Sequence, residues 1–334
     1  MTRRGIVLFA ALGLIWGVPY LFIKIAVAEL SPEMLVLARC AIAAALLLPL
    51  AAYRRAILPV LRRWKPLLAF AVAEIVLPWY FLNAAEQRLP SSTAGLLLSV
   101  VPLAAVGVAF ALGRRDRITT VNAVGIAVGM VGVAAIVGLD LGGSDLIGVA
   151  QLIIVVIGYA VGPVILARWM SDLPGVGVMA AALAISAVLS VPIVLFTGGW
   201  PTAMPSTPVI VSVLVLAAFC SALAFLMMFA LIAEIGPIRM TAITYVNPAV
   251  AVLAGALVLG EQVTVWTIAG FALILLGCWL VTKPDRSGPH ADPSRKLDPS
   301  IHEPAAQENR DDDVLSGLPR HDRGEDRVDS AAAR

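Results

Sequence analysis

The chain has 334 residues, of which 60% are hydrophobic and only 14% charged, whereas an average soluble domain has roughly 45–50% apolar and about 25% charged residues. The charges are unevenly distributed: residues 1–282 contain 15 Lys/Arg and 10 Asp/Glu, while residues 283–334 contain 9 and 12. The composition therefore excludes an ordinary water-soluble globule, and it separates an apolar body from a charged tail.

Ten apolar segments of the body have the length of a membrane-spanning helix. About 20 residues are needed to cross a hydrocarbon layer about 30 Å thick, because lipid offers no partner to unpaired backbone groups. The connections between the segments are short, which leaves no room for a soluble domain inside the body. We predict spans at 6–28, 35–53, 67–87, 91–112, 119–139, 147–169, 176–197, 209–234, 238–259 and 264–282.

Basic residues accumulate in alternate connections. With the N-terminus in the cytoplasm, the outer side has only Arg88, and the inner side has Arg3, Arg4, Arg54, Arg55, Arg62, Arg63, Lys65, Arg114, Arg115, Arg117, Arg168 and Arg239. An excess of Lys and Arg in cytoplasmic loops is typical of membrane proteins. We therefore expect a multi-pass protein of the cytoplasmic membrane with both termini in the cytoplasm.

The tail from 283 to 334 is rich in Pro, Asp, Arg and Ser and includes the acidic run Asp311, Asp312 and Asp313. Such a segment cannot bury enough apolar surface to offset the entropy of ordering it. We predict that the tail is disordered and cytoplasmic.

The body has no histidine, because all three histidines lie in the tail. Its cysteines, Cys40, Cys220 and Cys278, lie in apolar runs without a CxxC motif, which is typical of buried hydrophobic side chains. No GxxxxGK[ST] phosphate-binding loop is present. We therefore expect no metal, no cofactor, no catalytic residue and no direct use of ATP.

The second half of the body repeats the first. At a shift of 145 residues, Gly17 falls on Gly162, and Asp116, Thr119, Gly125 and Gly132 fall on Glu261, Thr264, Gly270 and Gly277. Residues 5–138 and 148–282 are thus predicted to be two five-helix units. Because five is odd, the second unit enters the membrane from the opposite side. Inverted repeats of this kind occur in many secondary transporters, which bind solute at the membrane midplane.

Several short motifs resemble the EamA family of the drug/metabolite transporter superfamily. They are Ile15-Trp16-Gly17 followed by Lys24, Ala38-Arg39, the stretch 91–97 leading to Pro102, Tyr245-Val246-Asn247-Pro248, and Leu259-Gly260-Glu261. The resemblance covers residues 5–282 and implies ten spans in two repeats and the transport of small solutes. One departure is Gly113-Arg114-Arg115-Asp116, where such repeats usually have a Gly-Glu pair.

Glu74 is the strongest candidate for the transport chemistry. It lies eight residues into the third predicted span, roughly 12 Å at the helical rise, and charges at that depth are costly unless they have a function. Because lipid disfavours a charged carboxyl group, Glu74 is predicted to bind solute or to carry a coupling proton. The alternative is a structural hydrogen bond to a neighbouring helix.

Further candidates lie near the middle of other spans. For contact with solute or proton we select Trp16, Tyr159, Ser99, Tyr245 and Asn247, in addition to Glu74. For helix bending around a central pocket we select Pro19, Pro78, Pro102, Pro163 and Pro248. The alternative for these prolines is a kink that only improves packing against a neighbour.

Lys24 and Arg39 lie near the predicted outer ends of the first two spans. Long basic side chains can reach the interface from such positions, and we expect them to pair with Glu29 or Glu33. Recognition of an anion is the alternative.

The prediction from the sequence is an all-α membrane protein that acts as a secondary active transporter. We expect export of a small metabolite or drug-like solute by alternating access, with a proton as a candidate coupling ion. The expected partners are the solute and membrane lipid, without nucleic acid, and a homodimer is left open. The alternatives are a membrane-embedded enzyme and a non-transporting scaffold whose tail recruits partners.

Overall fold

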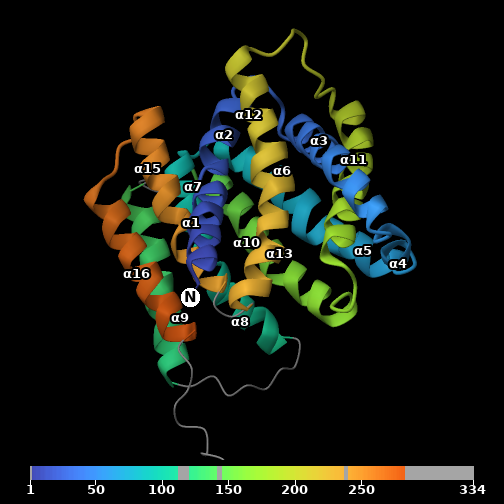
Figure 1. Ribbon diagram of the computed structural model, residues 1–334. Coiled ribbons are helices and arrows are strands. Elements are labelled where there is room, and N and C mark those ends of the chain that lie inside the picture. The colour runs from blue at the N-terminus through green and yellow to red at the C-terminus, as the bar shows by residue number, and fades with distance from the viewer. Residues whose placement is uncertain (1, 112–119, 141–144, 237–239, 283–334) are drawn as a thin grey trace, which may run out of the picture. The chain divides into compact units, whose positions relative to one another are not determined.

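The structure is a computed structural model that describes residues 2–111, 120–140, 145–236 and 240–282 (Figure 1). In these residues all regular structure is helical and no strand occurs. The predicted disorder of the tail and the 113–116 departure concern residues outside the described part. The observed elements confirm the prediction of an all-α fold.

The first half contains α1 (Arg3–Gly17), α2 (Pro19–Ala26), α3 (Pro32–Tyr53), α4 (Ile57–Leu61), α5 (Trp64–Phe70), η1 (Ala71–Val76), α6 (Leu77–Glu86), α7 (Ser91–Leu98), α8 (Val101–Ala111), α9 (Thr120–Ala135) and η2 (Ile136–Asp140). The second half contains α10 (Leu146–Trp169), α11 (Gly175–Thr197), α12 (Thr207–Ala217), η3 (Ala218–Leu223), α13 (Ala224–Ile235), η4 (Thr241–Tyr245), α15 (Asn247–Leu259) and α16 (Val265–Thr282). The labels follow Figure 1.

The helices match the ten predicted spans. Among the described residues, eight helical segments are long and apolar enough to cross a membrane. Two shorter apolar helices, Ile243–Leu259 and Val265–Val281, occupy the ninth and tenth predicted spans. The third span runs from Trp64 to Glu86 and the eighth from Thr207 to Ile235, each within a few residues of its prediction.

The two halves pair in a pattern that is unchanged when they are exchanged. Counted from the N-terminus, the fifth span packs against the tenth (α9 with α16), the second against the seventh (α3 with α11) and the fourth against the ninth (α7 with α15). The third span packs against the sixth (α6 with α10), and the first against the eighth (α2 with α12). These last two pairs replace each other on exchange, so the bundle has a pseudo-twofold relation between its repeats.

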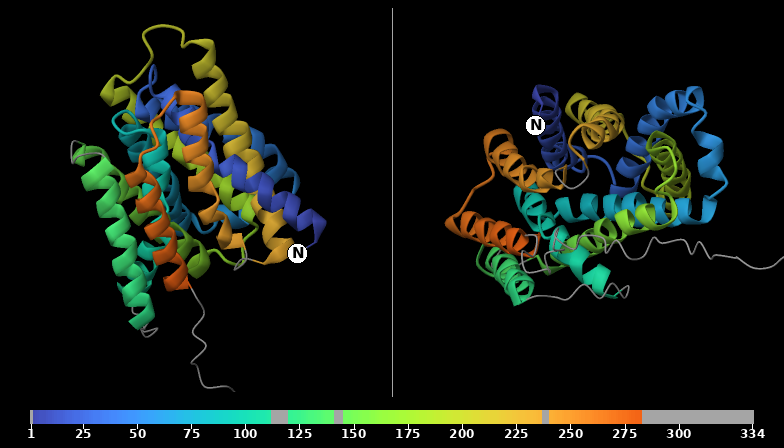
Figure 2. Two further views of the ribbon diagram at one scale, coloured as in Figure 1. Left: turned by 90° about the vertical axis from the view of Figure 1, so that its left-hand side faces the viewer. Right: turned by 60° about the horizontal axis from the view of Figure 1, so that its bottom comes forward.

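Glycines between α9 and α16 establish the direction of that relation. A Cβ added at Gly125 would lie 2.8 Å from the carbonyl oxygen of Gly277, and one at Gly132 would lie 2.6 Å from that of Gly270. The later residue of one helix meets the earlier residue of the other, so the two helices are antiparallel, and they lie side by side in both views (Figures 1 and 2). A twofold axis relating antiparallel helices is perpendicular to them. The repeats are therefore inverted with respect to a membrane that these helices cross.

The third and eighth spans each contain a π-helix. The segments Ala71–Val76 and Ala218–Leu223 are both six residues long and lie in the middle of their spans. A π-helix widens one turn of an α-helix and is frequent at functional sites. Since the feature occurs in both repeats, it belongs to the repeating unit.

Three other spans are interrupted next to a proline. The first span changes from α1 to α2 at Val18, directly before Pro19. The fourth changes from α7 to α8 at residues 99–100, before Pro102, and the ninth changes from the 3₁₀ segment η4 to α15, whose second residue is Pro248. Proline lacks a backbone donor and is best tolerated in the first turn of a helix. Each break places its proline in the first turn of the helix that follows.

The buried core is shared by both repeats. One cluster of buried apolar side chains includes Ile23 and Leu97 of the first repeat together with Leu152 and Leu216 of the second. Neither half therefore has a separate core in this region, and polar groups buried between the halves are enclosed by both.

Candidate functional site

A set of polar side chains lies among the central spans, and we call it the polar cluster: Tyr20, Arg39, Glu74, Glu86, Tyr159 and Ser221. Tyr159 interacts electrostatically with Glu74, Arg39 and Glu86, and it has Trp79 as a side-chain hydrogen-bonding neighbour. Tyr20 interacts with Tyr159, Glu86 and Arg39. The cluster thus joins the first, second, third, sixth and eighth spans, which come from both repeats.

Glu74 lies in η1 at the eleventh of the 23 residues of its span. Its side chain packs against Gly162 of α10 so closely that a Cβ at that glycine would collide with the carboxyl group. The Oε2 atom is buried and has no hydrogen-bond partner in the described part of the chain. The structure therefore provides a mid-span carboxyl group at the seam between the third and sixth spans, close to Tyr159.

Arg39 does not reach the interface to pair with Glu29 or Glu33, and this expectation is corrected. Its side chain is only 7% exposed, its Nε donates to Ser221 Oγ at 2.9 Å, and its guanidinium carbon lies 3.7 Å from the centre of the Trp79 ring. The physical reason is that the aromatic face and the hydroxyl offer inward contacts that replace water.

Lys24 also turns inward. Its Nζ donates to the carbonyl oxygens of Glu86 at 2.6 Å and Leu89 at 2.9 Å, which satisfies carbonyl groups at the C-terminal end of α6. Lys24 therefore caps the end of α6 with two hydrogen bonds.

Glu86 is a functional candidate that the sequence analysis did not identify. It has no exposed surface, and both carboxyl oxygens lack a hydrogen-bond partner among the described residues. A carboxylate at the end of a span is more often exposed to solvent than buried. The nearby Lys24 was the available signal, since a basic and an acidic residue both sit where two spans end on the same side.

The other predicted contact residues have separate surroundings. Trp16 forms an edge-on ring pair with Phe225, with 6.4 Å between ring centroids, inside an apolar cluster. Ser99 donates to the carbonyl oxygen of Leu96 within its own helix. The amide nitrogen of Asn247 donates to the carbonyl oxygens of Ile243 and Gly13 at 3.1 Å each. Among the six candidates, only Glu74 and Tyr159 lie in the polar cluster.

Tyr245 ends η4 and packs against the shared core. Pro78 follows η1 directly and faces Gly158 of α10, while Pro163 lies inside α10. Pro78 thus follows Glu74 in the third span, and Pro163 follows Tyr159 in the sixth span.

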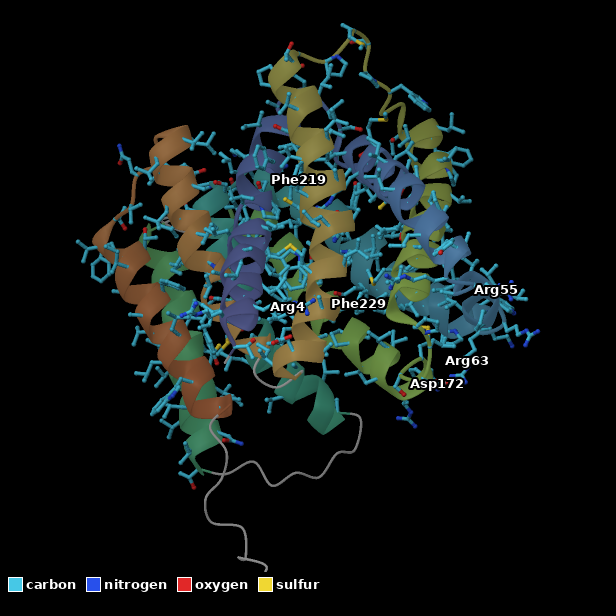
Figure 3. All side chains as sticks on the ribbon, viewed as in Figure 1. Arg4, Arg55, Arg63, Asp172, Phe219 and Phe229 are labelled. Carbon is cyan, nitrogen blue, oxygen red and sulfur yellow. The ribbon has the colours of Figure 1, made fainter. Side chains whose placement is uncertain are left out.

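Hydrogen bonds join the repeats at both ends of the bundle. We call the first set the Arg63 bridge; its members are Arg63, Asp172 and Trp169. Arg63 Nη1 and Nη2 each donate to Asp172 at 2.7 Å, and Nη1 also donates to the Trp169 carbonyl at 2.6 Å. Figure 3 labels Arg63 and Asp172. Hydrogen bonding to Arg63 holds the pKa of Asp172 below its ordinary value. This bridge joins the connection before the third span to the connection after the sixth.

The Glu33 bridge lies at the other end of α3. Thr197 Oγ1 donates to Glu33 at 2.7 Å, Ser31 Oγ donates to the Gly199 carbonyl at 3.0 Å, and the Ser206 backbone N–H donates to Glu29 at 2.7 Å. Hydrogen bonds from Ser206 hold the pKa of Glu29 below its ordinary value. At the shift of 145 residues that relates the repeats, the connection 27–31 corresponds to 172–176, and the connection 54–61 corresponds to 199–206. The two bridges therefore join equivalent pairs of connections in the two halves.

A third contact joins the repeats at the fourth span. Glu261 accepts hydrogen bonds from the backbone N–H groups of Ser91 at 2.7 Å and Ser92 at 2.9 Å, at the N-terminus of α7. Partial burial acts to raise the pKa of Glu261, but the hydrogen bonds from Ser92 and Ser91 outweigh it, so the pKa is lowered. A negative carboxylate at a helix N-terminus is favourable.

The described residues contain no group of three or more His, Cys, Asp or Glu side chains that could hold a metal ion. What they contain is a bundle of apolar helices in inverted repeats, with ionisable groups buried between the halves. This combination defines an integral membrane transporter.

Residues 3–138 and 146–283 each match the EamA-like transporter family, so the chain belongs to this family. The match appears twice and follows the two repeats. It confirms the resemblance to EamA proteins.

Relatives in bacteria are also named as transporters. The chain is 33% identical over 279 residues to the uncharacterized inner membrane transporter YedA of Escherichia coli (strain K12), covering 81% of this chain and 88% of that protein. It is 26% identical over 283 residues to the uncharacterized transporter YvbV of Bacillus subtilis (strain 168), covering 83% and 91%. With its apolar helices, the chain is thus a multi-pass inner-membrane protein of the transporter class.

A solved crystal structure has the same fold. It superimposes with a TM-score of 0.61 at 20% sequence identity, and the match covers 84% of this chain and 98% of that one. At this identity the likeness concerns the fold alone.

Proposed function

We propose that the protein is a secondary active transporter that exports a small metabolite or drug-like solute by alternating access, coupled to proton movement through Glu74. The observation that carries the proposal is the position of Glu74, a mid-span carboxyl group with an unpartnered Oε2 at the seam between the repeats. A group at a seam changes its surroundings when one half moves against the other.

The coupling role follows from the electrostatic cost of the site. A carboxylate without hydrogen-bond donors is unfavourable in an apolar environment, while access to water or to a cation lowers that cost. Glu74 contacts α10 at Gly162, where no side chain separates the two helices. A small shift of α10 would therefore change the proton affinity of Glu74 on each transport step.

The alternating-access step is supported by the two bridges. Alternation requires two states of similar free energy, which inverted repeats supply because each half can adopt the conformation of the other. The Arg63 bridge and the Glu33 bridge are equivalent contacts at opposite ends of the bundle. Opening one while the other stays closed would expose the polar cluster to one side only.

We also propose which end of the bundle faces the cytoplasm. With the basic connections in the cytoplasm, the Arg63 bridge faces the cytoplasm and the Glu33 bridge faces the exterior. Both chain ends are then cytoplasmic, and export is the direction that the family resemblance favours.

Glu74→Gln tests the proposal. The solute is first identified by comparing metabolites released by cells with and without the protein. In liposomes with a pH gradient, we then expect Glu74→Gln to reduce gradient-driven flux of that solute to the level of protein-free liposomes. Asp145→Asn, which changes a carboxylate outside the spans that belongs to neither bridge, is the matched control and should retain the flux. Unchanged flux in Glu74→Gln would remove Glu74 from the coupling role.

Removal of residues 284–334 separates this proposal from a scaffold function. A carrier should transport its solute without the tail, since the polar cluster and both bridges belong to the first 282 residues. A scaffold that recruits partners through the tail would lose its function after the same deletion.

A further inference from the structure

Arg39 is a buried basic group that has no carboxylate within ion-pair distance among the described residues. In the described part of the chain, its electrostatic neighbours are, from the strongest, Cys220, Tyr159, Cys40 and Glu86. Thiol and phenol groups are neutral near pH 7 at their ordinary pKa values. The only acidic neighbour is thus also the weakest.

Glu86 interacts electrostatically with Arg39 but forms no ion pair with it within 4.0 Å. Among the charges around Glu86, Lys24 interacts most strongly, and Arg39 comes after Glu261. Glu74 interacts with Tyr159 but is not among the electrostatic neighbours of Arg39. A buried cation without a hydrogen-bonded anion is unfavourable, so a carboxylate bound at the guanidinium would stabilise it.

The contacts of Arg39 leave one edge of the guanidinium open. Trp79 covers its face at 3.7 Å, and Ser221 takes its Nε proton. Neither Nη1 nor Nη2 has a hydrogen-bond partner in the described part of the chain, and both atoms keep some accessible surface. The open edge holds two parallel N–H donors, which is the geometry that a carboxylate fits with two hydrogen bonds.

Ser221 and Trp79 also fix the position of this edge. Ser221 belongs to η3 of the second repeat, and its hydroxyl donates to the Leu216 carbonyl at 2.8 Å while accepting from Arg39. Trp79 belongs to α6 of the first repeat. The guanidinium is thus held between the two repeats in a defined orientation before any solute binds.

We propose that the open edge of Arg39 is an anion-binding site and that the transported solutes are small organic carboxylates. The carboxylate supplies a negative charge directly at the guanidinium, and the tyrosines of the polar cluster lie beside the rest of the solute. This inference rests on the proposed transport function, because it names the chemical class of the solute.

The test compares two probes of the same shape, benzoate and benzamide, of which only benzoate is charged. Binding is measured by titration calorimetry on the full-length protein in nanodiscs of neutral lipid at constant ionic strength. We expect benzoate to bind about tenfold or more tightly than benzamide, because hydrogen bonds to charged groups are the stronger ones. Equal binding of the two probes, or tighter binding of benzamide, would overturn the proposal.

Three variants assign the effect to Arg39. Arg39→Gln should remove the preference for benzoate, and Arg39→Lys should keep only part of it, since an ammonium group cannot offer two fixed parallel donors. Arg62→Gln, a change at an exposed arginine outside the cluster and both bridges, should behave like the wild type. If Arg39→Gln does not fold, the Arg39→Lys result decides: a full preference in that variant contradicts the site.

Phenyl phosphate distinguishes the anion. Tighter binding of phenyl phosphate than of benzoate would overturn the assignment to carboxylates. The binding assay is also independent of transport. If the protein transports solute in liposomes but has no Arg39-dependent preference for benzoate, the anion site is wrong and the transport proposal is unaffected. If the preference is present but the protein gives no flux, the transport proposal is wrong.

Discussion

The third and eighth spans contain the same backbone feature with different chemistry. Each has a six-residue π-helix, and the fourth residue is Glu74 in η1 and Ser221 in η3. Glu74 has a carboxyl oxygen without a partner, while Ser221 uses its hydroxyl for both Arg39 and Leu216. The π-helix therefore belongs to the repeating fold, whereas the carboxyl group at its fourth residue belongs to the first repeat only.

An almost symmetric bundle can thus carry different side chains at equivalent places of its two repeats. Glu74 and Glu86, both of the first repeat, have buried carboxyl oxygens that lack a hydrogen-bond partner in the described part of the chain. Variants of the two π-helices and of the contacts between repeats test whether this difference is functional.

Making the two π-helices alike should have the largest effect. In Glu74→Ser, η1 has the same residue type as η3, and we expect gradient-driven flux to fall to the level of protein-free liposomes because no group at the seam exchanges a proton. Folding should be retained, since the backbone feature does not depend on the carboxyl group. Persistent coupling measured in liposomes would show that the difference between Glu74 and Ser221 is not functional.

Closing the space beside Glu74 should have the next largest effect. A Cβ in Gly162→Ala would collide with the carboxyl group, and overpacking of this kind costs about 1–3 kcal/mol of unfolding free energy. Thermal denaturation in detergent measures the change. Gly107→Ala is the matched control, because a Cβ at that glycine meets no atom within 4 Å, and a normal melting temperature in Gly162→Ala would contradict the close contact.

Ser221→Ala should act on stability but not on coupling. The change leaves the Arg39 Nε donor without its acceptor, which costs about 1–3 kcal/mol for a buried group. We expect a lower melting temperature and an unchanged ratio of gradient-driven to passive flux. A loss of that ratio would assign part of the proton coupling to the second repeat.

The Glu261 contact should give a smaller, pH-dependent effect. We expect Glu261→Gln to lower stability by roughly 0.5–1 kcal/mol, as for a carboxylate at a partly exposed helix N-terminus. Since the folded state lowers the pKa of Glu261 from 4.5, its contribution is present above that value and is lost as the pH falls through the lowered one. The free energies of unfolding of the wild type and the variant, measured between pH 7 and pH 3, should therefore converge at the acidic end.

The spans and the repeat could be predicted because lipid allows few alternatives. Apolar runs of the right length stand out when the backbone must satisfy itself, and the glycines at 125, 132, 270 and 277 keep their spacing because two backbones touch there. The depth of Glu74 followed from its position in the third span. These features depend on local sequence and on the helical rise.

Other features depend on contacts between distant segments. The inward direction of Arg39 depends on Trp79 and Ser221, and the burial of Glu86 depends on packing of the whole bundle. Neither is visible from distance along the chain, so the sequence predicted a snorkelling side chain for Arg39 and no role for Glu86. The π-helices also have no sequence signature that periodicity would reveal.

Site-directed labelling shows whether equivalent connections of the two repeats lie on opposite sides of the membrane. Arg54 and Thr202 lie in the connections after the second and seventh spans, which are equivalent in the two repeats, and both residues are exposed. After replacement of the three native cysteines by alanine, Arg54→Cys and Thr202→Cys are treated in intact cells with a membrane-impermeant maleimide. We predict labelling of Thr202→Cys only, with Arg54→Cys labelled after the membrane is opened. Labelling of both positions from the same side would contradict the inverted repeat.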